Sequence, residues 1–315
     1  MQSNNNREYT VGWICALPIE LVAAEAMLDE RYEDYRSGQY TLGRIGPHYV
    51  VMACLPAGLI GTNAAATVAT KMVCNFPSIR FGLMVGIGGG VPSEDFDIRL
   101  GDVVVSLPDK GYGGVVQYDF GKTRPGEFEM TGFLNAPPTA LLEAVSALRA
   151  KHLSGKSKLP ENIHAATHQL QFALETTRTD MLFEPDYDHI EGSTCERCSK
   201  ERLITRRPRH QDVAIHYGTI ASGNQVMRDG STRDSLSSKL GGVLCFEMEA
   251  AGLMNSFPCL VIRGICDYAD SHKNKAWQPY AAMTAAAYAK EVLTVIPGTE
   301  VTKTEVVDEA TKAVR

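Results

Sequence analysis

The chain has 315 residues, of which 44% are hydrophobic and 22% are charged, and its formal net charge is −6 at pH 7. This composition is ordinary for a globular protein, and the negative charge argues against a surface that binds nucleic acid by neutralising phosphates. No apolar run approaches the roughly 20 residues that cross a bilayer, and the polar start lacks the order of a signal peptide. We therefore expect a cytoplasmic protein without membrane or nucleic-acid partners, whose eight cysteines are reduced.

The first half of the chain alternates between strand and helix patterns. Residues 1–8 are polar and are expected to form a disordered leader. A short apolar run then precedes Pro18, and proline is typical of the first turn of a helix. The pattern predicts strands at 9–16, 40–45, 49–54, 81–87, 100–107 and 114–120, and helices at 18–30, 62–73 and 138–150.

The second half begins with a stretch of different texture. Residues 153–212 are charged and contain proline without a long period, so we expect an insertion, part loop and part helix, in a domain that spans 9–297. Residues 298–315 are expected to be a frayed or disordered tail. The alternation of strands and helices indicates an α/β fold with a helix-covered, largely parallel sheet. In this half, the pattern predicts strands at 213–222 and 259–265 and a helix at 276–296.

Acidic side chains are concentrated in one stretch, Cys245–Asp270. The pattern places Glu247 and Glu249 at the start of a small-residue helix, and Asp267 follows an apolar strand. The carboxyl ends of strands are where open α/β sheets bind ligands. Cleavage of an N-glycosidic bond needs an acid for the leaving base, a group that holds the sugar hydroxyls, and a nucleophile on the other face of the sugar. The stretch is therefore expected to form the sugar and base half of a nucleoside-cleaving site.

Each candidate residue also has an ordinary explanation. Partial desolvation after a buried strand would favour a protonated Asp267, although a lone aspartate there more often caps a turn. Glu249 can accept hydrogen bonds from two ribose hydroxyls, and Glu20 can polarise a water, but acidic residues are common in the first turn of any helix. Met248 could pack against a sugar or fill a gap in the core. Only their joint presence favours catalysis.

Two further motifs carry weaker signals. The run Val85–Val91 lets backbone approach a ligand, but its glycine spacing matches neither a dinucleotide fingerprint nor a phosphate loop, so we expect no cofactor. Cys195 and Cys198 have the spacing of a metal-ligand pair, with His189 before them and His210 after them. Because the second half of a four-ligand site is not clear, the pattern favours two reduced thiols and no metal, with a structural zinc as the alternative.

Taken together, these motifs resemble the purine and uridine phosphorylase superfamily, which includes the methylthioadenosine and adenosylhomocysteine nucleosidases. The main matches are Phe246–Ala251 and Arg263–Asp267, and the similarity covers most of 9–297 apart from the insertion. In the sequences of these motifs, the chain is most similar to the fungal branch, where such domains occur alone or ahead of repeat-containing and nucleotide-binding signalling regions. The resemblance implies a three-layer α/β/α fold with a mixed, partly barrel-like sheet, and a homodimer or higher oligomer.

The resemblance also implies roles for single residues. Glu20 falls where the nucleosidases hold the attacking water, Glu249 where the ribose 2′ and 3′ hydroxyls are bound, and Asp267 where an acid protonates purine N7. Met248 falls beneath the sugar and Trp277 where an aromatic residue closes over the 5′ side. The other residues expected to bind the purine nucleoside are Ile87, Gly88, Asn224, Gln225, Val226 and Glu247.

Departures from the family pattern narrow the expected reaction. The regions of Glu20 and Ile87 contain none of the arginines with which the phosphorylases bind phosphate, and Glu20 would repel a dianion. Ile87 also replaces a serine, and Val226 an aromatic residue, of the bacterial nucleosidases, which favours a plain purine nucleoside over a 5′-methylthio substrate. We expect hydrolysis to free base and ribose, with phosphorolysis or a non-catalytic nucleoside sensor as the alternatives.

Overall fold

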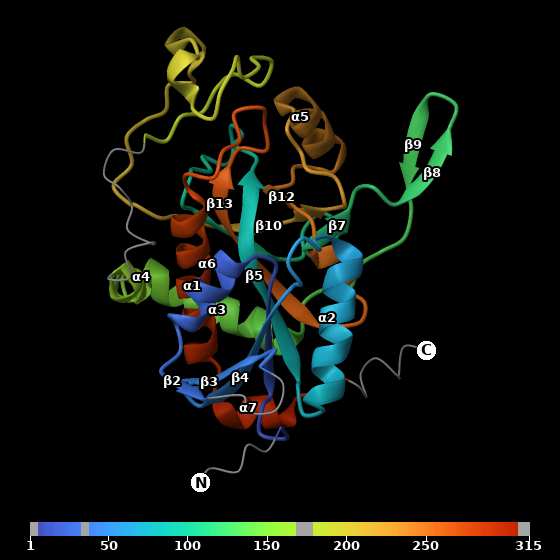
Figure 1. The fold of residues 1–315 in the computed structure, drawn as a ribbon, viewed down its shortest axis with the longest axis vertical. Helices are drawn as coiled ribbons and strands as arrows, with labels where there is room; N and C mark the ends of the chain where they lie inside the picture. Colours follow the sequence, from blue (N-terminus) through green and yellow to red (C-terminus); the bar gives the residue numbers. More distant parts are fainter. Residues whose placement is uncertain (1–5, 33–37, 168–178, 308–315) are drawn as a thin grey trace.

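In a computed structural model of the protein, the described residues are 6–32, 38–167 and 179–307 (Figure 1). Strands and helices alternate, as the sequence predicts. The strands are β1 (Val11–Cys15), β2 (Glu30–Tyr32), β3 (Thr41–Ile45), β4 (His48–Cys54), β5 (Phe81–Gly90), β6 (Val103–Ser106), β7 (Val115–Gln117), β8 (Gly121–Arg124), β9 (Glu127–Met130), β10 (Ile215–Gly218), β11 (Ile220–Ser222), β12 (Cys245–Glu247) and β13 (Cys259–Asp267). The helices are α1 (Pro18–Glu25), α2 (Thr62–Asn75), α3 (Thr139–Leu153), α4 (Leu159–Thr167), α5 (Gly230–Lys239), α6 (Gln278–Val295) and α7 (Gly298–Lys303).

Eleven of these strands form one mixed sheet, which confirms the predicted α/β fold class. The long strand β5 lies at its centre, between β1 and β13, and it pairs in parallel with both. At its far end, Gly89 and Gly90 pair with β12 in the antiparallel direction. The sheet therefore branches at the end of β5, and this branch brings β12 beside the ends of β1 and β13.

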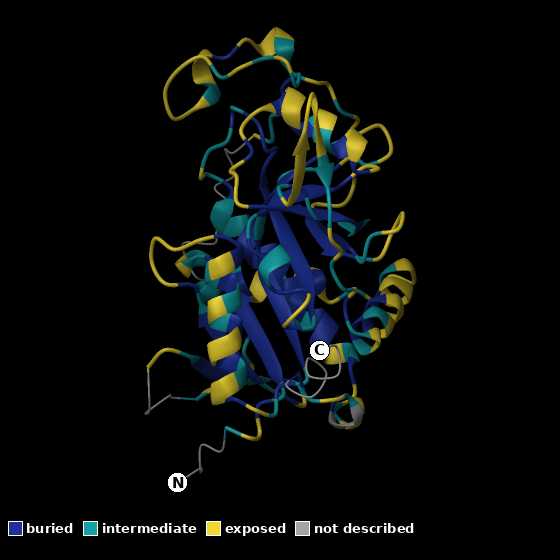
Figure 2. Ribbon diagram, turned by 90° about the vertical axis from the view of Figure 1, so that its right-hand side faces the viewer, coloured by how far each residue is buried: buried dark blue, intermediate teal, exposed yellow. Residues whose placement is uncertain are grey.

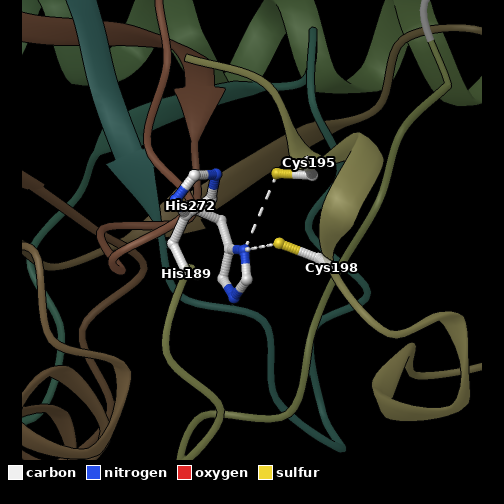
Figure 3. A group of neighbouring side chains, drawn as sticks. All are labelled: His189, Cys195, Cys198 and His272. Carbon is white, nitrogen blue, oxygen red and sulfur yellow. Dashed lines mark hydrogen bonds between the residues drawn. The ribbon is translucent and has the colours of Figure 1, made fainter. Parts of the chain in front are cut away.

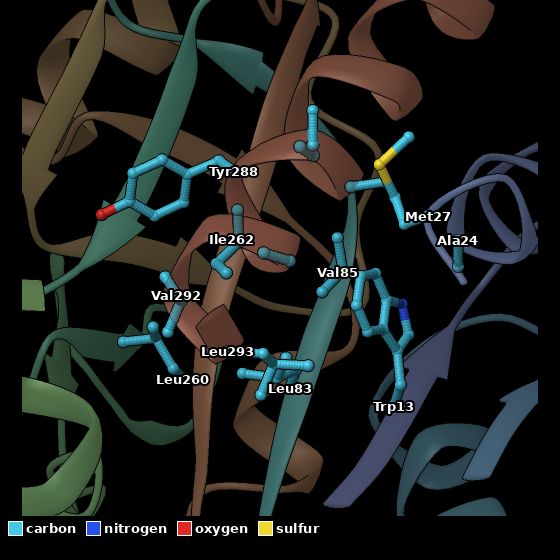
Figure 4. Packing of buried hydrophobic residues seen from close by; sticks show 14 of the residues in the cluster. Trp13, Ala24, Met27, Leu83, Val85, Leu260, Ile262, Tyr288, Val292 and Leu293 are labelled. Atoms are coloured by element: carbon cyan, nitrogen blue, oxygen red, sulfur yellow. The ribbon is translucent and has the colours of Figure 1, made fainter. Parts of the chain in front are cut away.

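The two faces of the sheet carry separate hydrophobic cores. Successive side chains of a strand point to opposite faces, so Trp13 packs in one core while Ile14 packs in the other. Figure 4 shows the first core, where Trp13 and Ile262 lie near Leu293 of α6. On the other face, α2 packs against the sheet through Ala65, Ala69 and Met72 (Figure 1). Figure 2 shows that the central strands, which lie between the helices of the two faces, are buried.

The structure corrects several element boundaries, and the helix predicted at 18–30 ends at Glu25. The predicted strand at 213–222 is divided at Thr219, because β10 pairs with β6 whereas β11 pairs with β7 and β12. The predicted end of a strand at Ile87 is wrong as well, since β5 continues through the three glycines to Gly90. The hairpin of β8 and β9, which the sequence pattern did not predict, extends away from the body of the molecule in Figure 1.

The ends of the chain are only partly described. Residues 1–5 of the predicted leader and 308–315 of the predicted tail lie outside the described residues. The prediction of a frayed tail is wrong for 298–307, because α7 forms there and the side chains of Val301 and Val307 are buried. No helix within the described ranges is long and apolar enough to cross a membrane.

Candidate active site

A cleft of about 170 Å³ opens where β1, β5, β12 and β13 end. The first turns of α1 and α6 close its sides. Because β5 pairs with both β13 and β12, the branch of the sheet gathers acidic side chains from distant parts of the sequence at this edge. The residues that line the cleft are Ala16, Leu17, Glu20, Ile60, Ile87, Gly88, Gly89, Gln225, Val226, Met227, Phe246, Glu247, Met248, Glu249, Cys266, Ala269, Lys273 and Gln278.

Glu20 is buried in the first turn of α1 and is held by backbone alone. Its Oε2 accepts hydrogen bonds from the N–H groups of Ala16 at 2.7 Å and Leu17 at 2.9 Å. Its Oε1 accepts one from the N–H of Ile87 at 2.8 Å. Burial raises the pKa of Glu20, although the charge of Arg263 and these hydrogen bonds oppose that shift. The side chain thus joins the end of β1 to β5 and still faces the cleft.

Arg263 on β13 is fully buried among three carboxylates. Its Nη2 donates to Glu247 Oε2 in a short ion pair and lies 3.4 Å from Glu249 Oε2. Its Nη1 donates to the carbonyl oxygen of Ile87 at 3.4 Å. Burial opposes the charge of this guanidinium, but the carboxylates of Glu247, Glu249 and Glu20 raise its pKa overall. The positive charge of buried Arg263 therefore offsets negative charge of these three carboxylates.

Glu249 faces the cleft beside the loop that precedes α2. Its Oε1 accepts a hydrogen bond from the N–H of Gly61 at 3.3 Å. Gly61 has a φ of 94°, in the left-handed region that favours glycine, so the loop can present this N–H. Burial raises the pKa of Glu249 to about 7, with Arg263 opposing the shift. At neutral pH the carboxylate and the carboxylic acid are therefore both populated.

Asp267, at the end of β13, forms an ion pair with Lys273. Lys273 Nζ lies 2.9 Å from Asp267 Oδ2, and Oδ1 accepts a hydrogen bond from the N–H of Ala269 at 2.9 Å. A Cβ atom on Gly89 would lie 2.7 Å from Asp267 Oδ1, so the glycine allows β5 to run alongside this carboxylate. Burial opposes the charge of Lys273, but Asp267 raises its pKa overall. Lys273 lines the cleft, whereas Asp267 lies behind it.

The cleft brings together most of the predicted site residues. Glu20 and Glu249 line it directly, whereas Asp267 lies behind it, beside Lys273 and Gly89. The predicted substrate-binding residues that line it are Ile87, Gly88, Gln225, Val226, Glu247 and Met248.

Two residues that are predicted to contact substrate do not line the cleft, and one local element is corrected. Asn224 does not line the cleft, because its Oδ1 accepts hydrogen bonds from both the N–H and the hydroxyl of Thr62 at 3.1 Å. Trp277 packs against Tyr280 with ring centroids 5.9 Å apart, and the next residue, Gln278, lines the cleft instead. The predicted small-residue helix after Glu249 is a single 3-10 turn, Ala250–Gly252.

The sequence pattern missed two charged residues of the site. Arg263 lies in one of the motifs that carry the family resemblance, but the resemblance implies no function for it. Its position in an apolar strand is the available signal, because a buried arginine requires acidic partners. Lys273 follows Asp267 by six residues in a loop, and nothing in its local pattern distinguishes it from a solvated lysine. His216 does not line the cleft, and its Nε2 lies 2.9 Å from Asp102 Oδ2.

Comparison with a family model identifies the class of protein. Residues 10–294 match the phosphorylase superfamily, so the chain belongs to that family. The chain is 49% identical over 298 residues to a nucleotide-binding leucine-rich repeat (NLR)-like protein of Hyaloscypha variabilis; this match covers 92% of the chain but only 29% of that relative. The chain therefore spans less than a third of the length of this relative.

Two other relatives match over nearly their whole length. The chain is 29% identical over 301 residues to a 5′-methylthioadenosine/S-adenosylhomocysteine nucleosidase of Mycobacterium bovis, which covers 91% of this chain and 97% of the relative. The solved structure of a nucleosidase with the same name from S. pneumoniae, in complex with a transition-state inhibitor, superimposes with a TM-score of 0.59 at 19% identity and covers 91% of this chain and all of the other. The fold is thus that of the nucleosidases.

Proposed function

We propose that the protein hydrolyses the N-glycosidic bond of purine ribonucleosides and releases the free base and ribose. The observation that carries this proposal is the buried carboxylate of Glu20 at the cleft. Its Oε1 accepts one backbone hydrogen bond, from Ile87, and a carboxylate oxygen has two lone pairs. The second lone pair is available to a water, and the raised pKa of Glu20 suits a group that takes a proton from that water.

Glu249 has the chemistry to hold the sugar. An ionised carboxylate accepts hydrogen bonds from two adjacent hydroxyls, and these bonds strengthen as the sugar gains positive charge in the transition state. Oε1 is held by the N–H of Gly61, and Oε2 lies near Arg263, so the group is fixed before substrate binds. Met248, also in the cleft, offers an apolar surface for the sugar ring.

Asp267 and Lys273 supply the proton for the leaving base in this proposal. The water gives its oxygen to the sugar and one proton to Glu20, the glycosidic bond breaks, and the base leaves neutral once it receives a proton from the other end of the cleft. Lys273 Nζ lies 2.9 Å from Asp267 Oδ2 and lines the cleft, so the two side chains act as one unit that can pass one proton to the leaving base.

The position of Arg263 favours hydrolysis over phosphorolysis. Phosphate binding in a cleft requires a guanidinium or ammonium that is free to pair with a dianion. The guanidinium of Arg263 is fully buried and already committed to Glu247 and Glu249. The cationic residue among those that line the cleft is Lys273, which is paired with Asp267.

Product analysis tests this proposal. We would incubate the protein with adenosine, guanosine, inosine and 5′-methylthioadenosine, with and without phosphate, and identify the sugar product. Free ribose at equal rates in both buffers is expected from the plain nucleosides, and ribose 1-phosphate only with phosphate would overturn it. Glu20→Gln should abolish release, whereas Glu25→Gln on the same helix should not, because its carboxylate pairs with Arg31 outside the cleft.

A nucleoside sensor without turnover is the second candidate. It is favoured by the position of Asp267, which is paired with Lys273 and does not itself line the cleft. It is also favoured by the similarity to part of an NLR-like protein. Saturable nucleoside binding by calorimetry with no base released over a long incubation would establish this candidate. Light scattering in the same buffer tests the homodimer or higher oligomer that the family implies.

A further inference from the structure

A second group of chemically active side chains lies outside the cleft. His189, Cys195, Cys198 and His272 each offer one atom that can bind a metal, and these four atoms lie within 4.8 Å of one another (Figure 3). Cys198 and His272 are buried. Three of the residues belong to the range predicted as an insertion, and His272 belongs to the loop that follows β13. Of the two histidines that the sequence suggests, His189 belongs to this group, whereas His210 lines a different cavity.

The distances within this Cys/His cluster fit tetrahedral zinc. Zn–S bonds of about 2.3 Å and Zn–N bonds of about 2.0–2.1 Å, set at tetrahedral angles, place sulfur and nitrogen ~3.6 Å apart. His272 Nδ1 lies 3.6 Å from Cys195 Sγ and 3.7 Å from Cys198 Sγ. Two thiolates and two imidazoles are a ligand set typical of structural zinc sites.

The orientation of His272 is fixed for metal binding. Its Nε2–H donates to the carbonyl oxygen of Tyr187 at 2.9 Å, so Nδ1 carries the lone pair that faces the two sulfurs. Its ring stacks on Phe183 with centroids 4.0 Å apart, and its backbone N–H donates to Asp270 Oδ1 at 3.0 Å. The His189 ring is held as well, because its Nε2 lies 3.1 Å from the carbonyl oxygen of Thr194.

Thiol hydrogen bonds alone do not explain this arrangement. A neutral imidazole nitrogen has one lone pair and accepts one good hydrogen bond, yet two sulfurs approach His272 Nδ1 at nearly equal distances. A shared cation at the centre of the group satisfies all four atoms. Cys195 and Cys198 are free thiols in the structure and do not form a disulfide.

We propose that His189, Cys195, Cys198 and His272 bind one structural Zn²⁺ that fastens the chain around 183–204 to the loop after β13. This segment has little regular structure of its own, apart from two 3-10 turns and the bridge between Phe183 and Leu203. The loop carries Lys273, the partner of Asp267, next to His272. The metal therefore stabilises one wall of the cleft without entering it.

Metal content tests the proposal independently of any activity. The protein would be reconstituted with zinc under reducing conditions, desalted and analysed by mass spectrometry for metal. We expect about one zinc per chain in the wild type and none in Cys195→Ser/Cys198→Ser, while Cys74→Ser, at an exposed position on α2, keeps its zinc. A chelator should lower the Tm of the wild type and of Cys74→Ser.

A second measurement covers the case in which the double variant does not fold. Wild-type protein loaded with Co²⁺ should show the thiolate charge-transfer and ligand-field absorption of a tetrahedral thiolate site, and zinc should displace it. Less than half an equivalent of zinc in the wild type, together with a Tm that a chelator does not change, would overturn the proposal. A Cys195–Cys198 disulfide found by mass spectrometry in place of bound metal would do the same.

Discussion

The carboxylate cleft and the Cys/His cluster solve the same problem in different ways. Both bury polar side chains that repel one another or lack a partner. In the cleft, strand-borne Arg263 compensates the acidic residues, and backbone N–H groups hold Glu20. In the cluster, irregular loops bring together two thiols and two imidazoles, and the proposed zinc supplies the positive charge that thiolates need. The comparison teaches that side chains of the protein can balance the charges of a site built on strand ends. The site built on loops requires a bound metal ion to do so.

The largest expected effect is on turnover. Asp267→Asn should lower kcat for base release by about 10²–10⁴-fold, because removal of a positioned acid costs that much. The Tm should remain close to that of the wild type, since the amide oxygen can still accept the hydrogen bond from Ala269. Asp95→Asn, at an exposed position, is the matched control and should leave kcat unchanged. An unchanged rate in Asp267→Asn would end the proposed mechanism.

The next effect is on stability. Arg263→Met should lower the free energy of unfolding by about 3–5 kcal/mol at pH 8, because it leaves Glu20, Glu247 and Glu249 buried without a counter-charge. Urea unfolding measures this, and part of the loss should be recovered at pH 5, where Glu249, whose pKa burial raises to about 7, takes up a proton. Arg44→Met removes an exposed arginine of an ion pair and should change little. Equal losses of unfolding free energy in the two variants would contradict the conclusion that Arg263 compensates the charge of the buried carboxylates.

The third effect is on pH dependence. Because burial raises the pKa of Glu249 to about 7, kcat/KM should rise about tenfold per pH unit below 7 and level off above it, as the hydroxyl-binding carboxylate forms. The free energy of unfolding should fall as pH rises from 4.5 toward 7, since the folded state keeps a proton that the unfolded state releases. In Glu249→Gln, the rise of kcat/KM with pH below 7 should disappear. If the rise persists in this variant, it belongs to the titration of another group.

The smallest effect links the two regions. Cys198→Ser should change kcat/KM for base release by less than about tenfold, although it loses zinc, because the cleft's walls on β1, β5 and β12 do not depend on the loops. Steady-state kinetics beside a thermal melt would measure both quantities on one sample. Loss of all activity with the fold intact would mean that Lys273 depends on the metal and that the two sites act as one.

The sequence predicted the central strands of the sheet because apolar runs such as 81–87 and 259–265 must be buried on both faces, but it did not predict the short strands β2 and β12. It could not predict where the glycines belong. Gly86 and Gly89 lie inside β5, where added Cβ atoms would meet Glu20 and Asp267 at 2.5 and 2.7 Å. Those approaches depend on strand pairing across the whole chain, which no local pattern encodes.

The cleft residues were predicted through motif and order, but partners from distant sequence were not. His272 joins Cys195 and Cys198 only because the loop after β13 lies beside them, across more than 70 residues of sequence. Trp277 does not line the cleft although the next residue, Gln278, does, because the orientation of the start of α6 decides which of the two faces it. Tertiary packing decides both placements, and a local sequence pattern does not contain it.

The three backbone hydrogen bonds of Glu20 bear on how this site changes by mutation. Loss of the side chain would leave the buried N–H of Ala16 and the part-buried N–H groups of Leu17 and Ile87 without this partner, at a cost of about 1–3 kcal/mol for the buried one. A descendant that no longer cleaved nucleosides would therefore still be selected to keep this glutamate for folding. A glutamate at this position in a related chain is therefore evidence that the connection between the end of β1 and β5 is kept. It is weaker evidence that the chain is catalytically active.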